Sequence, residues 1–411
     1  MNLLKKYSQS TFFFILLFII LSFLLPKFSI FNNLIELPNN YKLPVAKNIT
    51  FITKWLIEDA SLGLFTFKEL TRAIGSILDI PSIFLKGLLA TGFKLESASG
   101  DSIFIQPFSW ISVIFVFVMI GVWLKDISLS IFVAISFFYV ALFDLWESTM
   151  TTFSSIIVAV IIGIIFGTFL GILSYKFHRI NNILTPTFDF MQTMPVFAYL
   201  VPALMLFGYG PAAALIVTLI YAMPPMARVT KSALDQVNSE VIELGQMVGC
   251  STFQMLKKVL LPSIKPRMML GVNQVIMLTL NMVIIASMIG AGGLGYDVWQ
   301  SLKQLRIGQG FEAGIAITLV AIVLDRLSQK IASRRSIYDH KEVDFFQKYK
   351  FLILSFLIII FTWLVGQKYP FLITLPENFT FSSGRFWDGI IDYININFHD
   401  SINLVRYFFF I

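Results

Sequence analysis

Few residues in this sequence could carry out covalent chemistry, and their spacing does not assemble a catalytic site. The three histidines, His178, His340 and His399, lie far apart, and none accompanies a nucleophile. The single cysteine, Cys250, excludes an internal disulfide. No G-x-x-x-x-G-K-[ST] phosphate loop occurs. We therefore expect no catalytic residue, no metal, no cofactor and no ATPase within this chain.

One glycine motif, Gly290-Ala-Gly-Gly-Leu-Gly295, matches the G-x-G-x-x-G fingerprint of dinucleotide-binding proteins. That fingerprint requires a preceding strand, whereas an apolar run of membrane-spanning length precedes it here. We therefore predict a bending loop and no nucleotide site.

The most informative spacing lies in residues 238–262, a polar interruption between long apolar runs. Asn238 and Ser239 are good N-cap residues, and Gly249 follows as a C-cap would. Ser251, with Gln254 three residues later, predicts a capping box that opens a second helix, and Pro262 predicts its end. The expected hairpin is helix, glycine, helix, proline.

Composition places this hairpin in an integral membrane protein. Of 411 residues, 57% are hydrophobic and 13% charged, too few polar groups to cover a soluble domain. A helical crossing needs about 20 apolar residues. The sequence predicts nine spans, at about 11–25, 108–124, 127–146, 151–174, 187–207, 210–227, 268–290, 312–332 and 351–367.

The net charge of +7 is explained by orientation, because cytoplasmic loops are enriched in Lys and Arg. Alternating along the nine spans from Lys5 and Lys6 puts the hairpin, with Lys257 and Lys258, in the cytoplasm. We expect a multi-pass protein of the inner membrane.

Four regions follow along the chain. Residues 1–107 are expected to form an uncleaved anchor helix and two amphipathic outer-surface helices, at 51–75 and 79–93, and residues 108–146 two accessory spans. Residues 147–340 form the predicted core. Residues 349–411 repeat the order of the front of the chain, a span followed by Leu-Pro and then Trp, which predicts the start of a second, incomplete repeat.

The hairpin resembles the E-A-A-x3-G-x9-I-x-L-P motif of permease subunits of ATP-binding-cassette importers. Glu243 takes the E position, Gly249 the G and Val259 the I, while Leu261 and Pro262 close the motif. Leu244 and Gly245 replace its two alanines. The resemblance implies that these seven residues form the coupling helices that sit in a cleft of a cytoplasmic ATPase.

The flanking spans, with TFDFMQTMPVFAYLVPALMLFGYG from Thr187 and GVNQVIMLTLNMVIIASMIGAGGLGYDVW from Gly271, resemble permeases of glycine betaine and proline betaine importers. This implies an all-α membrane protein with a methionine-importer-like core. It also implies a second permease subunit in a homodimer, a cytoplasmic ATPase pair and a periplasmic substrate-binding protein.

Polar and aromatic residues inside spans are the candidates for the transport pathway, with helix-to-helix hydrogen bonding as the alternative. They are Gln192, Thr193, Phe197, Tyr199, Asn273, Gln274, Asn281 and Ser287. Two other functions stay open: a secondary transporter or channel independent of ATP, and a non-transporting scaffold.

Overall fold

The computed structural model describes residues 45–61, 63, 65–96, 102–333, 345–373, 375–376, 379–399 and 407. The chain divides into two compact units, Met1–Thr66 and Phe67–Ile411. In the first unit the described structure is one helix, α3 (Val45–Glu58), followed by an isolated bridge between Ser61 and Thr66. The predicted anchor span at 11–25 lies outside the described residues.

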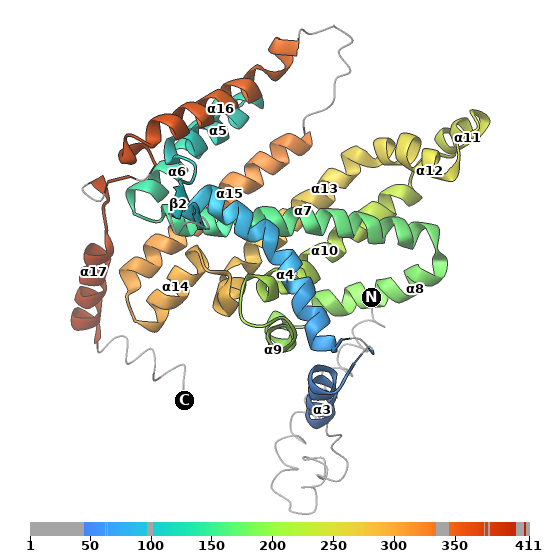
Figure 1. The fold of residues 1–411 in the computed structure, drawn as a ribbon, viewed down its shortest axis with the longest axis horizontal. Helices are drawn as coiled ribbons and strands as arrows, with labels where there is room; N and C mark the ends of the chain where they lie inside the picture. Colours follow the sequence, from blue (N-terminus) through green and yellow to red (C-terminus); the bar gives the residue numbers. More distant parts are fainter. Residues whose placement is uncertain are drawn as a thin grey trace, which may run out of the picture. The chain divides into compact units, whose positions relative to one another are not determined.

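The second unit is a helical bundle with one small β-hairpin (Figure 1). Its helices are α4 (Phe67–Lys86), α5 (Trp110–Trp123), α6 (Ile127–Leu142), α7 (Trp146–Lys176), α8 (His178–Thr193), α9 (Val196–Phe207), α10 (Pro211–Asp235), α11 (Ser239–Met247), α12 (Thr252–Gln254), α13 (Leu261–Ala286), α14 (Leu294–Lys303), α15 (Ile307–Ser333), α16 (Phe345–Gly366) and α17 (Gly384–Asn397). Helices α11 and α12 lie at one end of the bundle, and α14 and α17 at the other (Figure 1).

A glycine stripe sets the close packing at the centre of the bundle. A Cβ added at Gly167 would lie 2.7 Å from Met226 Cβ of α10, and one at Gly171 would lie 2.6 Å from the Ala227 carbonyl oxygen. A Cβ added at Gly163 would lie 3.2 Å from Val275 Cγ1 of α13. Small residues let helix backbones approach without a hydrophobic driving force in lipid. The stripe therefore brings α7, α10 and α13 together.

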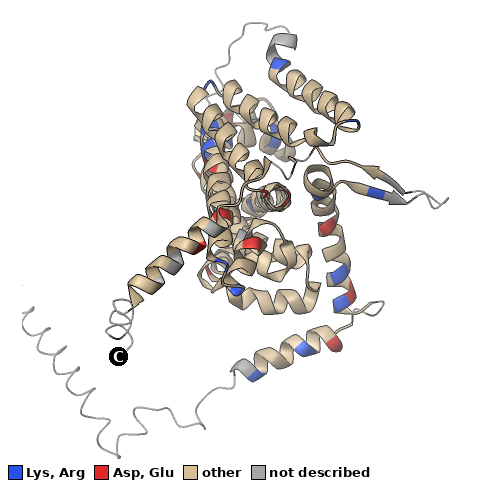
Figure 2. Cartoon of the chain, turned by 90° about the vertical axis from the view of Figure 1, so that its left-hand side faces the viewer, with Lys and Arg blue, Asp and Glu red and all other residues tan. Residues whose placement is uncertain are grey.

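Four helices of the described residues are long and apolar enough to cross a membrane, or up to six if each of two bent pairs counts as one span. The predicted spans at 151–174, 210–227 and 312–332 correspond to α7, α10 and α15, which reach 25 to 31 residues. Helices α5 and α6, at 14 and 16 residues, are shorter than the spans predicted there. Most of the ribbon is neither acidic nor basic, with Lys, Arg, Asp and Glu at few places (Figure 2).

The helices between residues 51 and 93 have other bounds than the two predicted there, and whether they lie at the outer surface stays a prediction. Residues Phe67–Thr91 form a 25-residue helical stretch that is long and apolar enough to span. Leu78 and Leu85 pack on the buried cluster of Val158, Ala159 and Leu215, so this helix lies against α7 and α10. Charges near its start, such as Lys68 and Arg72, concealed an apolar window that begins later in the helix.

A two-stranded antiparallel sheet was not predicted. Strand β1 (Phe93–Glu96) pairs with β2 (Ser102–Ile105), with Phe93 opposite Ile105. Its strands are four residues each, too short for an alternating pattern to stand out in the sequence.

The C-terminal helices pack on the bundle. Ser109 Oγ donates to the Leu372 carbonyl and Trp110 Nε1 donates to the Phe371 carbonyl at 3.2 Å, so the turn after α16 is held at the start of α5. Whether residues 349–411 begin a second repeat stays a prediction.

Candidate functional site

The first helix of the hairpin, α11, ends in a Schellman motif at Gly249. The Cys250 amide donates to the Gly245 carbonyl at 3.1 Å, and the Gly249 amide donates to the Gln246 carbonyl at 2.9 Å. Gly249 has a φ of 76°, which glycine adopts without the Cβ clash of other residues. The predicted C-cap is confirmed, and α11 has a fixed end.

The second helix opens with the predicted capping box. The Gln254 amide donates to Ser251 Oγ at 3.3 Å, and the Ser251 amide donates to Gln254 Oε1 at 2.9 Å. This reciprocal pair satisfies two amides that the first turn leaves without partners.

The prediction that Pro262 ends this helix was wrong. Helix α12 passes into a π-helical turn, Met255–Leu260, and then directly into α13, where Pro262 is the second residue. The Leu261 amide donates to the Leu256 carbonyl, and such a wide turn accommodates a proline that a regular helix interior excludes. The hairpin is therefore joined to α13 without a break.

Gly245 occupies the position of the second alanine in the importer motif, and its packing explains why a glycine is found there. It is buried, and an added Cβ would lie 2.6 Å from Met255 Cε and 3.5 Å from Val259 Cγ2. Below it, Leu260 and Ile264 form a buried cluster with Ala233 and Leu234, and Ile172, Tyr175, Ile242, Met255, Leu256 and Leu261 pack on this cluster. The two arms of the hairpin are thus packed on each other and on the ends of α7 and α10.

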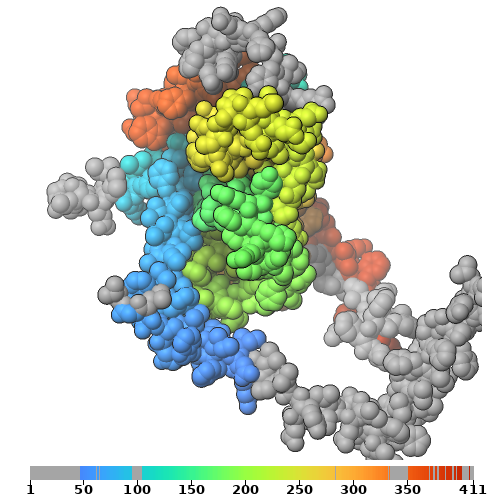
Figure 3. Space-filling view, turned by 90° about the vertical axis from the view of Figure 1, so that its right-hand side faces the viewer, coloured from blue at the N-terminus to red at the C-terminus, as the bar shows by residue number. Residues whose placement is uncertain are grey.

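The outer face of the hairpin is apolar and uncovered. Leu244 is 64% exposed, Met247 86%, Val248 75% and Phe253 69%. Glu243 is exposed beside them. In the space-filling view the yellow surface of the hairpin lies beside the green surface of the α7–α8 segment (Figure 3). Four large exposed apolar side chains thus lie together on a packed base, the kind of patch that marks interaction sites.

A second feature is a sharp break inside the predicted span 187–207, which contains Pro195. Helices α8 and α9 meet at 104°. Met194 is extended, with φ −68° and ψ 133°, because Pro195 disfavours a helical conformation for the residue before it. The bent pair is either one broken span or a re-entrant loop, and the break lies at a proline at which the sequence predicts one.

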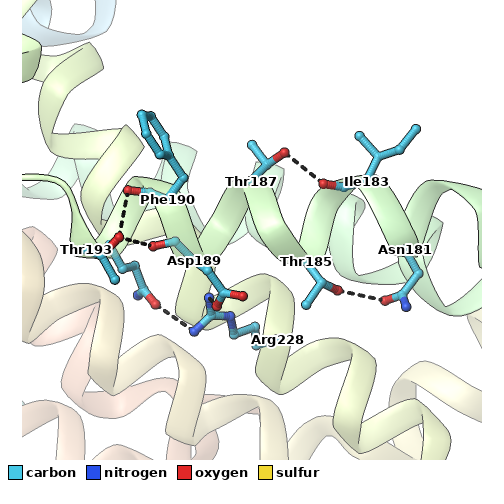
Figure 4. Close-up of polar contacts among 9 residues, drawn as sticks. Asn181, Ile183, Thr185, Thr187, Asp189, Phe190, Thr193 and Arg228 are labelled. Atoms are coloured by element: carbon cyan, nitrogen blue, oxygen red, sulfur yellow. Dashed lines mark hydrogen bonds and ion pairs between the residues drawn. The ribbon is translucent and has the colours of Figure 1, made fainter. Parts of the chain in front are cut away.

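An ion pair holds α8 against α10 near this break (Figure 4). Arg228 donates to Asp189 Oδ1 at 2.6 Å and to Gln192 Oε1 at 2.7 Å. Sequence analysis proposed Gln192 but missed Asp189 and Arg228 as partners. The available signal was two opposite charges near the ends of predicted spans, Asp189 at the start of 187–207 and Arg228 just after 210–227, since such charges usually pair.

Tyr199 links the two arms of the break. Its hydroxyl donates to the Met191 carbonyl at 2.8 Å, and Thr193 Oγ1 donates to the Asp189 carbonyl at 2.9 Å. Phe197 is 57% exposed on the α9 arm. Gln192, Thr193, Phe197 and Tyr199 are therefore gathered at one bend, with the tyrosine bracing it.

The remaining predicted pathway residues do not gather at that bend. Asn273 Oδ1 accepts a hydrogen bond from Ser328 Oγ of α15, and buried Ser287 donates to the Gly292 carbonyl at 2.8 Å. Gln274 and Asn281 are exposed on α13. They share a stripe with Leu270 at 64%, Met277 at 46% and Ile284 at 41% exposed, at the spacing of one helix face.

At the opposite end from the hairpin, α13 bends into a π-helical turn, Ser287–Ala291, and α14 begins at Leu294. Gly290, Gly292 and Gly293 all have positive φ, so the predicted bending loop is confirmed. On α14, burial raises the pKa of Asp297; a hydrogen bond with Ser148 opposes this shift and the charge of Glu147 adds to it.

The family model described as binding-protein-dependent transport system inner membrane component matches residues 159–336. The chain is 35% identical over 353 residues to the trimethylamine N-oxide transport system permease protein TmoV of Pelagibacter ubique, covering 82% of this chain and 49% of that protein. It is 39% identical over 220 residues to the glycine betaine transport system permease protein OpuAB of Bacillus subtilis, covering 54% and 78%. The chain thus spans about half the length of its trimethylamine N-oxide relative.

Among solved structures, one titled for inward-facing conformations of the MetNI methionine ABC transporter is similar, with a TM-score of 0.41 and 19% identity. The match covers 44% of this chain and 91% of that one.

Proposed function

Because this chain belongs to the family of binding-protein-dependent transport system inner membrane components, we propose that it is the permease subunit of an importer driven by a separate ATPase. It is a multi-pass inner-membrane protein, and its relatives are named as permeases, which are not enzymes. The observation that carries the proposal is the apolar, uncovered tip of the hairpin on a packed base.

The hairpin supplies the coupling. An ATPase that closes on ATP must move a membrane helix, which requires a rigid lever with a defined end. The Gly249 cap ends α11, the Gly245 contact with Met255 locks the two arms, and the continuous helix through Pro262 carries displacement into α13. Leu244, Met247, Val248 and Phe253 fill the cleft of the ATPase, with Glu243 and Val259 in the same hairpin.

A second permease subunit is proposed to cover the exposed stripe of α13. Leu270, Met277 and Ile284 offer apolar contacts, while Gln274 and Asn281 offer neutral polar groups in the middle of the membrane. Polar residues within spans usually face a cavity. A pathway between two copies of this stripe accounts for both the exposed apolar side chains and the polar side chains within the membrane. A homodimer is the simplest arrangement that brings two copies together.

The periplasmic substrate-binding protein is assigned to the end opposite the hairpin, where the glycine-rich bend and α14 lie. Helix α13 would carry out alternating access, because it is joined to the ATPase-facing hairpin at one end and to this bend at the other.

The proposed substrate is a small N-methylated zwitterion of the betaine class, with trimethylamine N-oxide as a close chemical relative. The names of the relatives point to this class. A methylated nitrogen offers no N–H donor, so aromatic faces are its natural partners. Phe197 and Tyr199 lie at the bend for this contact, and the uncharged Gln274 and Asn281 suit a substrate without net charge.

Reconstitution in vesicles tests the proposal. The chain is inserted alone, with the ATPase, and with both ATPase and binding protein, and uptake of radiolabelled glycine betaine and trimethylamine N-oxide is measured. We expect uptake only in the complete set with ATP. Uptake by the chain alone along an ion or solute gradient would identify a secondary transporter or channel instead.

Two matched variants test whether the ATPase binds at the tip of the hairpin. Met247→Asp places a charge on the exposed apolar face and should abolish ATPase binding, whereas Ser263→Ala, on the exposed start of α13, should leave binding unchanged. Equal ATPase binding by both variants would remove the hairpin from the docking surface.

A further inference from the structure

A small cavity lies inside the bundle at the bend of α13. Its volume is about 30 Å³, and it lies among α4, α7, α10 and α13 and the π-helical turn that follows α13. Six of its lining side chains carry hydroxyl groups: Ser82, Thr152, Ser155, Thr218, Thr279 and Ser287. Of these, only Ser287 was a candidate from the sequence. So many hydroxyls around one cavity in a membrane helix bundle require an explanation.

Thr279 is the unusual member of this set. It is 3% exposed, and its Oγ1 has no hydrogen-bond partner among the residues that the structure describes. Some threonines in this bundle donate to the carbonyl four residues earlier, as Thr218 does to Ala214 at 2.8 Å and Thr318 to Gly314 at 2.9 Å, whereas Thr149, Thr168 and Thr230 have no partner in the described part of the chain but do not line this cavity. A buried hydroxyl without a partner is unfavourable by about 1–3 kcal/mol.

Four of the other hydroxyls use their protons on backbone carbonyls. Ser155 donates to Thr151 at 3.2 Å, Thr152 to Ser148 at 2.9 Å and Ser287 to Gly292 at 2.8 Å, in addition to Thr218. Each hydroxyl has one proton and two lone pairs, so these four groups present only acceptors to the cavity. Thr279 and Ser82 are the lining hydroxyls whose protons are not used on a carbonyl among the described residues, and of the two only Thr279 Oγ1 is a buried atom without a partner.

We propose that this cavity is a binding site for an ordered water molecule that joins α13 to α7 and α10. A water needs about 10–15 Å³ and two to four polar partners, and both conditions are met. It would accept from Thr279 and donate its two protons to lone pairs of Thr218 and Ser155, which balances every donor with an acceptor.

A neutral ligand fits better than a cation. The lining contains hydroxyls, alkyl groups and backbone but no carboxylate. A cation buried without an opposite charge is strongly unfavourable. Thr279 lies about one helical turn before the 45° bend between Met282 and Ile284, and Ser287 of the π-helical turn also lines the cavity, so the water supports α13 where the helix bends.

Thr279→Val tests the proposal through the sign of its effect. If Thr279 had no partner, valine would remove an unsatisfied group and leave the melting temperature equal or higher. With a bound water, valine removes the donor of the buried Thr279 hydroxyl that holds it, and we expect the melting temperature of the detergent-solubilised full chain to fall by about 1–3 °C. Thr279→Ser keeps the hydroxyl and should behave like the unsubstituted protein.

Thr230→Val is the matched control. Thr230 is fully buried and its Oγ1 also has no partner among the described residues, but it does not line the cavity. We expect an equal or higher melting temperature for this variant. An equal or higher value for Thr279→Val as well would overturn the proposal.

A high-resolution density map of the assembled transporter would show directly what occupies the cavity. A single peak within hydrogen-bond distance of Thr279 Oγ1 and two other hydroxyls is the expected result. A peak surrounded by about six oxygens at about 2.4 Å would identify a hard cation, and a cavity without density would leave no ligand. Either of these results would overturn the assignment of water.

Discussion

Ser383 donates both its backbone amide and its hydroxyl to the carboxylate of Glu312, the hydroxyl at 2.7 Å. Glu312 is 5% exposed on α15, and both donors come from the segment that leads into α17. Asp388 of α17 accepts from the Gly308 amide at 3.0 Å and so caps the start of α15. The C-terminal segment thus completes the hydrogen bonding of a core helix.

This relationship predicts that the bundle depends on residues beyond 340. Ser383→Ala removes one donor to a buried carboxylate and should lower the free energy of unfolding by about 1–3 kcal/mol. Thermal unfolding in detergent measures this. Ser333→Ala removes a hydroxyl that bonds only a nearby carbonyl on an exposed turn and serves as the control. A chain ending at 340 that is as stable as the longer one would contradict the prediction.

Gly249 gives a prediction about coupling. Gly249→Val forces a branched side chain into φ 76°, which disrupts the C-cap of α11 without any clash, since no atom lies within 4 Å of an added Cβ. We expect normal insertion, continued ATP hydrolysis and a several-fold lower solute uptake per ATP. Gly249→Asn, which tolerates this conformation, should retain most coupling. Equal coupling ratios for the two variants would exclude this role.

The Arg228–Asp189 pair gives a prediction about the bend. Their side chains are 41% and 63% exposed, so the pair itself should contribute only about 0–1 kcal/mol to stability. Its effect should appear in transport: Arg228→Gln should lower uptake several-fold with little change in unfolding. Exchanging the two residues, as Asp189→Arg with Arg228→Asp, should restore part of the rate.

Lys231→Gln is the control for this pair, because it breaks a helical ion pair with Asp235 on the same helix. Its uptake should stay near that of the unsubstituted protein. A loss equal to that of Arg228→Gln would indicate a general effect of positive charge on α10.

Asp297 gives a prediction about pH. Burial raises its pKa above 3.8, so the folded state favours the protonated carboxyl. Stability from this group is present below the ordinary value and is lost as pH rises through the folded pKa. Asp297→Asn should therefore flatten the fall in melting temperature above pH 4.

The pKa of Asp126 is shifted in the opposite direction to that of Asp297. Hydrogen bonds with Lys330 and the Leu129 amide lower its pKa, so its contribution is present above the ordinary value and is lost as pH falls through the folded pKa. Asp126→Asn should matter near neutral pH and lose its effect in acid. Identical pH profiles for the two variants would contradict both assignments.

The hairpin could be predicted from sequence because its signals are local. The Gly249 cap and the Ser251–Gln254 box each depend on residues within one or two turns, and both were found where expected. The long apolar helices α7, α10 and α15 were predicted for the same reason, since hydropathy is a property of a continuous window.

Features that depend on distant partners could not be predicted. Pro195 marks a possible break in the sequence, but a proline can kink a span or divide it, so the 104° angle between α8 and α9 does not follow from the sequence. The pairs Asp189–Arg228 and Glu312–Ser383 join positions 39 and 71 residues apart, a distance over which no periodicity acts. The continuous helix through Pro262 depends on a π-helical turn that no local residue pattern announces.

The apolar tip of the hairpin also bears on how the cell makes this protein. A subunit that has not met its ATPase presents Leu244, Met247, Val248 and Phe253 to the aqueous phase, the kind of surface that chaperones and proteases recognise. A subunit docked in the complex hides it. The same four side chains that we propose to dock on the ATPase would therefore mark subunits without a partner for removal and keep permease and ATPase in matched amounts.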